Sequence, residues 1–345
     1  MDMNVRKQKI LEAIIRDYIE TGEPVGSRTI SKKYDLGVSS ATIRNEMADL
    51  EELGLIIQPH TSAGRIPSDK GYRLYVDGMM RRPQITPEVE QVITNLIRDK
   101  ITRIDSLVEE TAKLVAMLTN CTTIAMTPPI SQVCIKHIQL VPIDDYSVAC
   151  VIVTDTNSVK NHVIATPKAI DFNMCMALTN ILNEQLKGSS LSQISVDQIR
   201  ASIEDKMKEY GDIASSVLGA IDSTLKQEDI PEIYIRGTNN ILDFNGLYDK
   251  DKTRELFKLL EEKPYLSKLL DQSKPNTITV RIGEENALTP MKDYSVVTTS
   301  YSIGEHTIGN LGIIGPTRMN YDQVVSVLEY VSYHISNMLK DLNDS

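Results

Sequence analysis

Apolar and polar residues recur with a helical period near the N-terminus, in the segment 39–54. The apolar positions are spaced by three or four residues: Ile43, Met47, Leu50 and Leu53. This spacing predicts one amphipathic helix with a single apolar face. Ser39 is a suitable N-cap, because its hydroxyl can accept from the free N–H groups of the first turn. Gly54 predicts the end of the helix, since glycine adopts a left-handed conformation easily.

The polar face of this helix changes in charge along its length. The first turns are neutral or basic, with Ser39, Ser40, Thr42, Arg44 and Asn45, and the acidic residues follow later. Acidic side chains usually favour a helix start, because the backbone N–H groups there are electropositive. A start without them suits contact with phosphates and base edges, although a solvated surface helix would carry the same pattern.

Two further helices are expected before this one. Residues 5–20 place their apolar side chains on one face, and the sequence Thr-Gly-Glu-Pro at 21–24 ends that helix. Ser27 is expected to cap a short second helix that carries Arg28 and Lys32. Two helices joined by a short glycine-containing turn, the second with a polar start, predict a helix-turn-helix.

A short strand and a loop of small residues follow. Residues 55–58 read as a strand, and the loop 59–67 is bounded by prolines and carries Arg65 near its end. This composition favours a β-wing, whose arginine would be attracted by the negative potential of a DNA minor groove. The alternative is a plain hairpin connection.

The rest of the chain predicts an α+β body. Residues 86–118 read as a long helix, or as two helices broken near Asp105. Three strands at 135–141, 147–154 and 159–165 predict an antiparallel meander, in which the middle strand is expected to be buried on both faces. Residues from about 172 to 227 are mostly helical. Four further strands (230–236, 277–282, 294–301 and 306–314) and a final amphipathic helix follow, a pattern expected of one sheet domain interrupted by another.

Composition and charge fit a protein with an acidic body and a near-neutral N-terminal part. The 345 residues are 41% hydrophobic and 24% charged, which is typical of soluble domains, and the length suggests two or three of them. The net charge is −10, yet residues 1–82 hold 13 basic against 12 acidic side chains. This distribution is compatible with a local DNA-binding face. Without an apolar signal segment or a stretch that could span a bilayer, we expect a cytoplasmic protein with no membrane contact.

The sequence offers no pattern for catalysis, a metal or a cofactor. The four cysteines and five histidines are scattered without the spacing of a metal site. The glycine-rich segment 304–316 lacks the Lys-Ser/Thr pair of a phosphate loop, so a hairpin is the better interpretation. No serine or cysteine lies in a nucleophile motif. We therefore expect neither an enzyme nor a bound cofactor or metal.

Two segments carry a specific resemblance. Residues 39–55 read SSATIRNEMADLEELGL, and residues 59–77 read PHTSAGRIPSDKGYRLYVD. Both resemble the HrcA family of bacterial heat-inducible transcription repressors, and the length and the later segments agree with that family from end to end. The resemblance implies a winged-helix DNA-binding domain and a GAF-like domain that is interrupted by an inserted dimerisation domain.

The resemblance also implies how these domains divide the chain and what they bind. The expected division is a winged-helix domain at 1–82, a linker and long helix at 83–118, a GAF-like domain at 119–170 and 231–345, and the insertion at 171–230. The implied partners are an inverted-repeat DNA operator of the CIRCE type, a second copy of the chain, and the GroEL-type chaperonin that maintains the active repressor.

The family motifs cover a set of candidate DNA-contacting residues. Thr42, Arg44 and Asn45 are expected to touch base edges, because arginine suits guanine and asparagine suits adenine. The candidates for phosphate contact are Ser27, Arg28, Lys32, Ser39 and Ser40, and those of the wing are His60, Thr61, Ser62, Gly64 and Arg65. Two other classes of function remain open: a regulator that senses a metabolite in its sheet domain, and an enzyme or chaperone-associated interaction protein.

Overall fold

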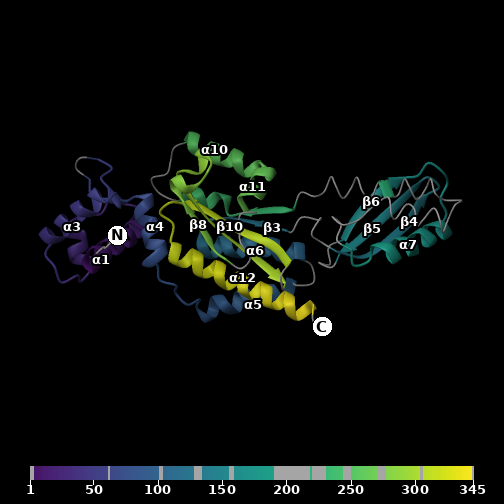
Figure 1. Cartoon of the computed structure of the whole chain (residues 1–345), viewed down its shortest axis with the longest axis horizontal. Coiled ribbons are helices and arrows are strands. Elements are labelled where there is room, and N and C mark those ends of the chain that lie inside the picture. Colours follow the sequence, from purple (N-terminus) through teal and green to yellow (C-terminus); the bar gives the residue numbers. More distant parts are fainter. Residues whose placement is uncertain are drawn as a thin grey trace. The chain divides into compact units, whose positions relative to one another are not determined.

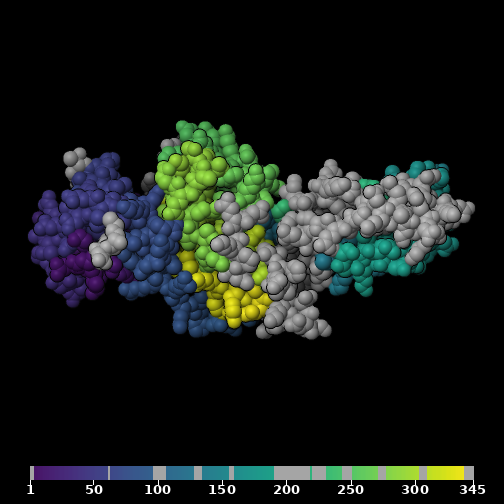
Figure 2. Space-filling model, viewed as in Figure 1, coloured from purple at the N-terminus to yellow at the C-terminus, as the bar shows by residue number. Residues whose placement is uncertain are grey.

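The computed structural model describes residues 4–60, 63–100, 104–127, 134–154, 159–189, 218–219, 231–243, 250–270, 277–303 and 306–343 (Figure 1 and, as a space-filling view, Figure 2). The chain divides into two compact units. The first unit comprises Met1–Asn95, Thr111–Ala125 and Tyr234–Ser345, and the second comprises Leu96–Glu110 and Met126–Ile233. We describe each unit by itself. No helix in the described ranges is long and apolar enough to cross a membrane.

The N-terminal part of the first unit, which we call the head (residues 4–60 and 63–82), contains four helices and a small hairpin. The helices are α1 (Val5–Thr21), α2 (Ser27–Lys33), α3 (Ser40–Glu52) and α4 (Asp69–Gly78), and the strands are β1 (Ile56–Ile57) and β2 (Ile66–Pro67). The expected apolar stripe of α3 is confirmed for Ile43, Met47 and Leu50, which are buried. Their burial against α1 and α2 supplies the main favourable term for folding of the head.

Helix caps in the head follow the sequence closely. The Ser39 hydroxyl accepts a hydrogen bond from the Thr42 N–H at 3.2 Å, which confirms Ser39 as the N-cap of α3. Gly54 follows this helix in the left-handed region, with φ +71°. One expectation differs by a residue. Gly26 is the N-cap of α2 and Ser27 is its first helical residue, without a side-chain cap, because Ser27 is already wound into the helix.

The second part of the first unit, which we call the sheet body, is built on a five-stranded sheet. Its strand order is β7 (Ile233–Arg236), β3 (Thr122–Met126), β10 (His306–Pro316), β9 (Tyr294–Ile303) and β8 (Thr279–Ile282). The pairs β10–β9 and β9–β8 are antiparallel. Helix α12 (Tyr321–Asn343) and the parts of α5 (Pro87–Lys100) and α6 (Ile104–Thr119) that belong to this unit, residues 87–95 and 111–119, lie along one face (Figure 1). Helices α10 (Lys250–Glu261) and α11 (Lys263–Leu270) lie along the other.

Short 3₁₀ turns complete the sheet body: η4 (Thr238–Asp243), η5 (Gly283–Glu285) and η6 (Thr289–Met291). The segment 86–118, for which the sequence predicted either one long helix or two, forms the two helices α5 and α6. The point between them, residues 101–103, lies outside the described residues. The expected α+β class is confirmed as a mixture of helices and antiparallel sheets.

The second unit contains a separate three-stranded sheet and a helix. The strands are β4 (Ile135–Asp144), β5 (Ser147–Thr154) and β6 (Val159–Ala165), and the helix is α7 (Phe172–Leu186). Both strand pairs are antiparallel, as the expected meander requires. Side chains of α7 satisfy the backbone of β4: the Asn183 Oδ1 atom accepts from the Ile138 N–H at 2.8 Å, and the Thr179 hydroxyl accepts from the Leu140 N–H at 3.0 Å. A helix therefore protects this sheet edge.

Two expectations about the meander differ from the structure. The middle strand β5 alternates between buried and half-buried positions, so only one of its faces is fully buried among the described residues. In addition, the meander does not join the C-terminal strands, because within the stretch 119–170 only β3 belongs to the five-stranded sheet. Hydrophobic periodicity shows which face of a strand is buried but not which sheet the strand joins. Most of the helices expected at 196–226 lie outside the described residues.

Candidate nucleic-acid interface

The exposed side of α3 carries the candidate base-reading residues. The side chains of Arg44 and Asn45 are exposed, and neither has a hydrogen-bond or ion-pair partner among the described residues. Thr42 is half-buried, and its hydroxyl lies 3.0 Å from that of Ser39. The first turn is thus fixed by its own cap, while the two longer side chains of the next positions are free to contact a ligand.

Two acidic residues in the middle of α3, Glu46 and Asp49, form ion pairs with α1. Lys7 of α1 lies 3.0 Å from Glu46 and 2.8 Å from Asp49. The carboxylates of Asp49 and then Glu46 raise the pKa of Lys7 above its usual range. These ion pairs neutralise the acids of the middle of α3, so they do not repel a polyanion that approaches Arg44.

Helix α2 packs against α3 and adds basic side chains. Arg28 and Lys32 are exposed, and neither has a salt-bridge partner in the described ranges. Lys33 differs, because its ammonium contacts Asp17 at 2.8 Å and Glu20 at 2.5 Å. These carboxylates raise the pKa of Lys33, with Asp17 the larger cause. Arg28 and Lys32 are therefore available for phosphate contact, while Lys33 holds α2 to α1.

The hairpin loop is attached to the rest of the head at its C-terminal end. Arg65 forms a backbone bridge with Val25, with both N–H···O distances 2.9 Å. A Cβ atom on Gly64 would lie 2.5 Å from the carbonyl oxygen of Val25. Glycine is therefore required at residue 64 by the close approach of the two backbones.

The side chain of Arg65 is already paired. Its Nε and Nη2 atoms lie 2.9 and 2.7 Å from the same carboxylate oxygen of Glu51. In this conformation Arg65 ties the loop to the C-terminal end of α3, and it can reach a minor groove only by leaving Glu51. His60 is exposed, whereas the candidates Thr61 and Ser62 lie outside the described residues. Of the phosphate candidates, Ser39 is exposed and Ser27 and Ser40 are half-buried.

Sequence reasoning missed the residues that fix the head against the sheet body. Asp322 at the start of α12 accepts hydrogen bonds from the Tyr75 hydroxyl at 2.8 Å and the Arg81 N–H at 3.2 Å. Arg73 of α4 forms a two-point ion pair with Glu285, at 2.8 and 2.5 Å. These pairs set the orientation of the helices that present Arg44. No local pattern could reveal them, because the partners are more than 200 residues apart.

Comparison with known proteins identifies the family. The family model for the HrcA protein C-terminal domain matches residues 105–325. The chain is 43% identical over its whole length to the heat-inducible transcription repressor HrcA of Ruminiclostridium cellulolyticum, which it also covers completely. It is 44% identical to the protein of that name from Lachnoclostridium phytofermentans, again with both chains fully covered.

A solved structure supports the fold over the full length. A crystal structure described only as that of a hypothetical protein is 26% identical, has a TM-score of 0.66, and shares 99% of each chain. The family relationship agrees with the resemblance at residues 39–77 and excludes the enzyme reading, since the relatives are named as repressors. The chain belongs to the HrcA family of heat-inducible transcription repressors.

Proposed function

We propose that this chain is a repressor of chaperone operons that binds an inverted-repeat operator of the CIRCE type as a homodimer. The head would act as a winged-helix domain, with α3 in the major groove and the hairpin loop as the wing. The observation that carries the proposal is the exposed and unpaired pair Arg44 and Asn45 beside the capped start of α3. The basic residues of α2 lie next to them and supply phosphate contacts.

A band shift with a palindromic fragment of a chaperone promoter tests this proposal. We expect the full chain to bind the fragment much more tightly than a scrambled fragment of equal length at the same salt concentration, because only the phosphate contribution is common to both. Equal binding of the two fragments, or no binding of either, would reject an operator-specific repressor.

The sheet body would be the GAF-like domain of the family.

The dimer contacts are proposed to lie in the second unit. Several large apolar side chains of its strands and helix are exposed: Val141, Ile143, Tyr146, Val159, Val163, Phe172 and Met176. Val141 and Val163 pair with Ala149 from its two sides, so they lie on one face of the sheet, and an exposed apolar face is typical of an interface. A two-fold dimer also matches the symmetry of an inverted repeat.

Val163→Asp should prevent this dimer. Val163 is 72% exposed in the single chain, so the aspartate costs little in the monomer but would bury an unpaired carboxylate in the interface. We expect light scattering after gel filtration to show a dimer for the original chain and a monomer for the variant. The matched control is Val92→Asp, which changes an exposed valine of α5 (51% exposed) in the first unit. A dimer in both variants would place the interface elsewhere.

Heat release is proposed to act through the folding of the repressor, with the GroEL-type chaperonin maintaining the DNA-binding form. Support comes from the relatives, which are named as heat-inducible. Repressor refolded from denaturant should bind its operator strongly only when chaperonin and ATP were present during refolding. Equal binding with and without chaperonin at every temperature would contradict this part of the proposal.

A further inference from the structure

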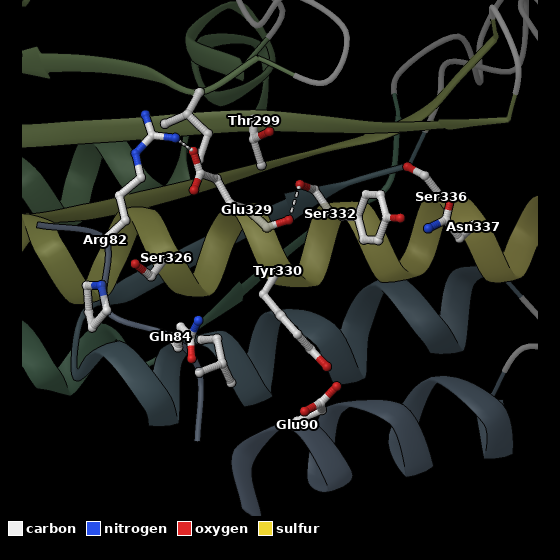
Figure 3. Close-up of a pocket in the computed structure, with 14 residues that line it drawn as sticks. Arg82, Gln84, Glu90, Thr299, Ser326, Glu329, Tyr330, Ser332, Ser336 and Asn337 are labelled. Atoms are coloured by element: carbon white, nitrogen blue, oxygen red, sulfur yellow. Dashed lines mark hydrogen bonds and ion pairs between the residues drawn. The ribbon is translucent and has the colours of Figure 1, made fainter. Parts of the chain in front are cut away.

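A cavity in the sheet body lies beside α12 and has no role in the proposed DNA contact. Its volume is about 860 Å³, which is within the range of small-molecule sites. Figure 3 shows that α12 crosses the cavity, with Thr299 of β9 on one side and Glu90 of α5 on the other. Arg82 and Gln84, from the segment that joins the head to α5, close one end.

Two hydroxyl groups at the buried side of this cavity lack partners. The side chains of Thr299 and Ser326 are only 1% and 7% exposed, and both line the cavity. Neither the Thr299 Oγ1 atom nor the Ser326 Oγ atom has a hydrogen-bond partner among the described residues. A buried hydroxyl without a partner is costly. Their position indicates that something else in the cavity donates to them or accepts from them.

The charged residues of the cavity favour a positively charged molecule. Arg82 is the one basic residue in the described lining, and its Nη1 atom lies 2.6 Å from the carboxylate of Glu329. Glu90 has no basic partner in the part of the chain that the structure describes. The charge of Arg82 is therefore neutralised by Glu329, while the Glu90 carboxylate has no positive charge beside it. This excess of negative charge disfavours ligands with phosphate or carboxylate groups and attracts a cation.

Aromatic rings add a second feature suited to a cation. In Figure 3 the Tyr330 side chain points toward Glu90. Burial, together with the Glu90 carboxylate, raises the pKa of Tyr330 to about 12, so the phenol stays neutral and does not compete as an anion. The ring of Tyr330 lies beside that of His334, with a centroid distance of 4.1 Å and the planes tilted by 32°, and Tyr333 also lines the cavity. Tyrosine faces beside a carboxylate bind ammonium groups well.

We propose that the cavity beside α12 is a binding site for a hydroxylated organic amine with one positive charge. The ammonium group contacts Glu90 and the Tyr330 ring, and a hydroxyl group of the ligand bonds to Ser326, which lies one helical turn before Tyr330 on the same side of α12. The inference goes beyond the repressor function, because it concerns the sheet body and holds whether or not the head binds an operator.

Ligand-observed NMR on the full chain tests the proposal with two matched pairs of probes. Tyramine and 4-hydroxyphenylacetate share a phenol but carry opposite charges, and glucosamine and glucuronate are a corresponding pair of sugars. Each probe is titrated without DNA, so the result does not depend on operator binding. The variants are Glu90→Gln and Ser326→Ala, which remove one charge and one hydroxyl with little change in volume. The control is Glu255→Gln, an exposed glutamate of α10 on the opposite face of the sheet.

We expect at least one amine to bind more tightly than its acid partner. Glu90→Gln should weaken binding of that amine by about tenfold or more, which is the usual effect of losing a charged hydrogen bond. Ser326→Ala should weaken binding of the amine less, and Glu255→Gln should leave its affinity unchanged, with the melting temperatures of all variants confirming that they fold. The proposal is overturned if neither amine binds, if the acids bind as well as the amines, or if the two cavity variants bind like the control.

Discussion

Arg44→Ala should weaken specific operator binding by about 1–3 kcal/mol, the usual value of a two-point arginine contact with a guanine. The prediction follows from the position of Arg44 one residue beyond the capped first turn of α3, where the side chain is exposed and unpaired. Since no intramolecular partner is lost, the free energy of unfolding should change little. Band shifts at a fixed salt concentration, with single base substitutions in the repeat, measure both the affinity for the operator and the preference for each base.

Two matched variants separate base recognition from charge. Arg44→Lys keeps the positive charge but loses the planar fork, so it should retain non-specific binding and lose preference at one base pair. Arg254→Ala removes the same charge from an exposed position of α10 and should leave operator binding unchanged. If Arg44→Ala reduced binding to a scrambled repeat as much as to the operator, Arg44 would contact phosphate and not a base.

Local signals in the sequence predicted the parts of the head that depend on neighbouring residues. The apolar stripe of α3, the Ser39 cap and the left-handed Gly54 were all readable, because each depends on residues within a few positions. The exposure of Arg44 and Asn45 follows from the same periodicity, since both lie outside the stripe. The contact of each with a base is still a prediction.

Contacts between distant residues could not be read in this way. The pairing of Arg65 with Glu51 depends on how the hairpin returns along α3, and composition alone suggested a free arginine. The separation of the β4–β6 meander from the five-stranded sheet could not be predicted either, because strand patterns do not specify a partner sheet. The unpartnered hydroxyl of Thr299 lies in a strand whose pattern indicated only burial.

The contact between the head and the sheet body leads to the second large effect. The ring of Tyr72 in α4 is 2% exposed and lies 5.7 Å from the ring of Tyr321 in α12, measured between centroids. The Tyr321 hydroxyl is held in turn by Ser295, at 2.6 Å, and by the carbonyl of Thr317, also at 2.6 Å. A ring in the body that is held by two hydrogen bonds therefore packs against a buried ring in the head. Removing the ring of Tyr72 would leave a cavity that neither side can fill easily.

Tyr72→Ala should lower the free energy of unfolding by about 3–5 kcal/mol, as large-to-small changes of buried aromatic residues do. Tyr72→Phe is the matched control. The Tyr72 hydroxyl is buried and has no hydrogen-bond partner among the described residues, so its removal should be neutral or slightly stabilising. Urea denaturation followed by circular dichroism gives both values. A loss in Tyr72→Phe as large as in Tyr72→Ala would show that the hydroxyl, and not the ring, joins α4 to α12. If the expected result is obtained, the packing of the Tyr72 ring against the Tyr321 ring holds the head, and with it α3, in a fixed orientation on the sheet body.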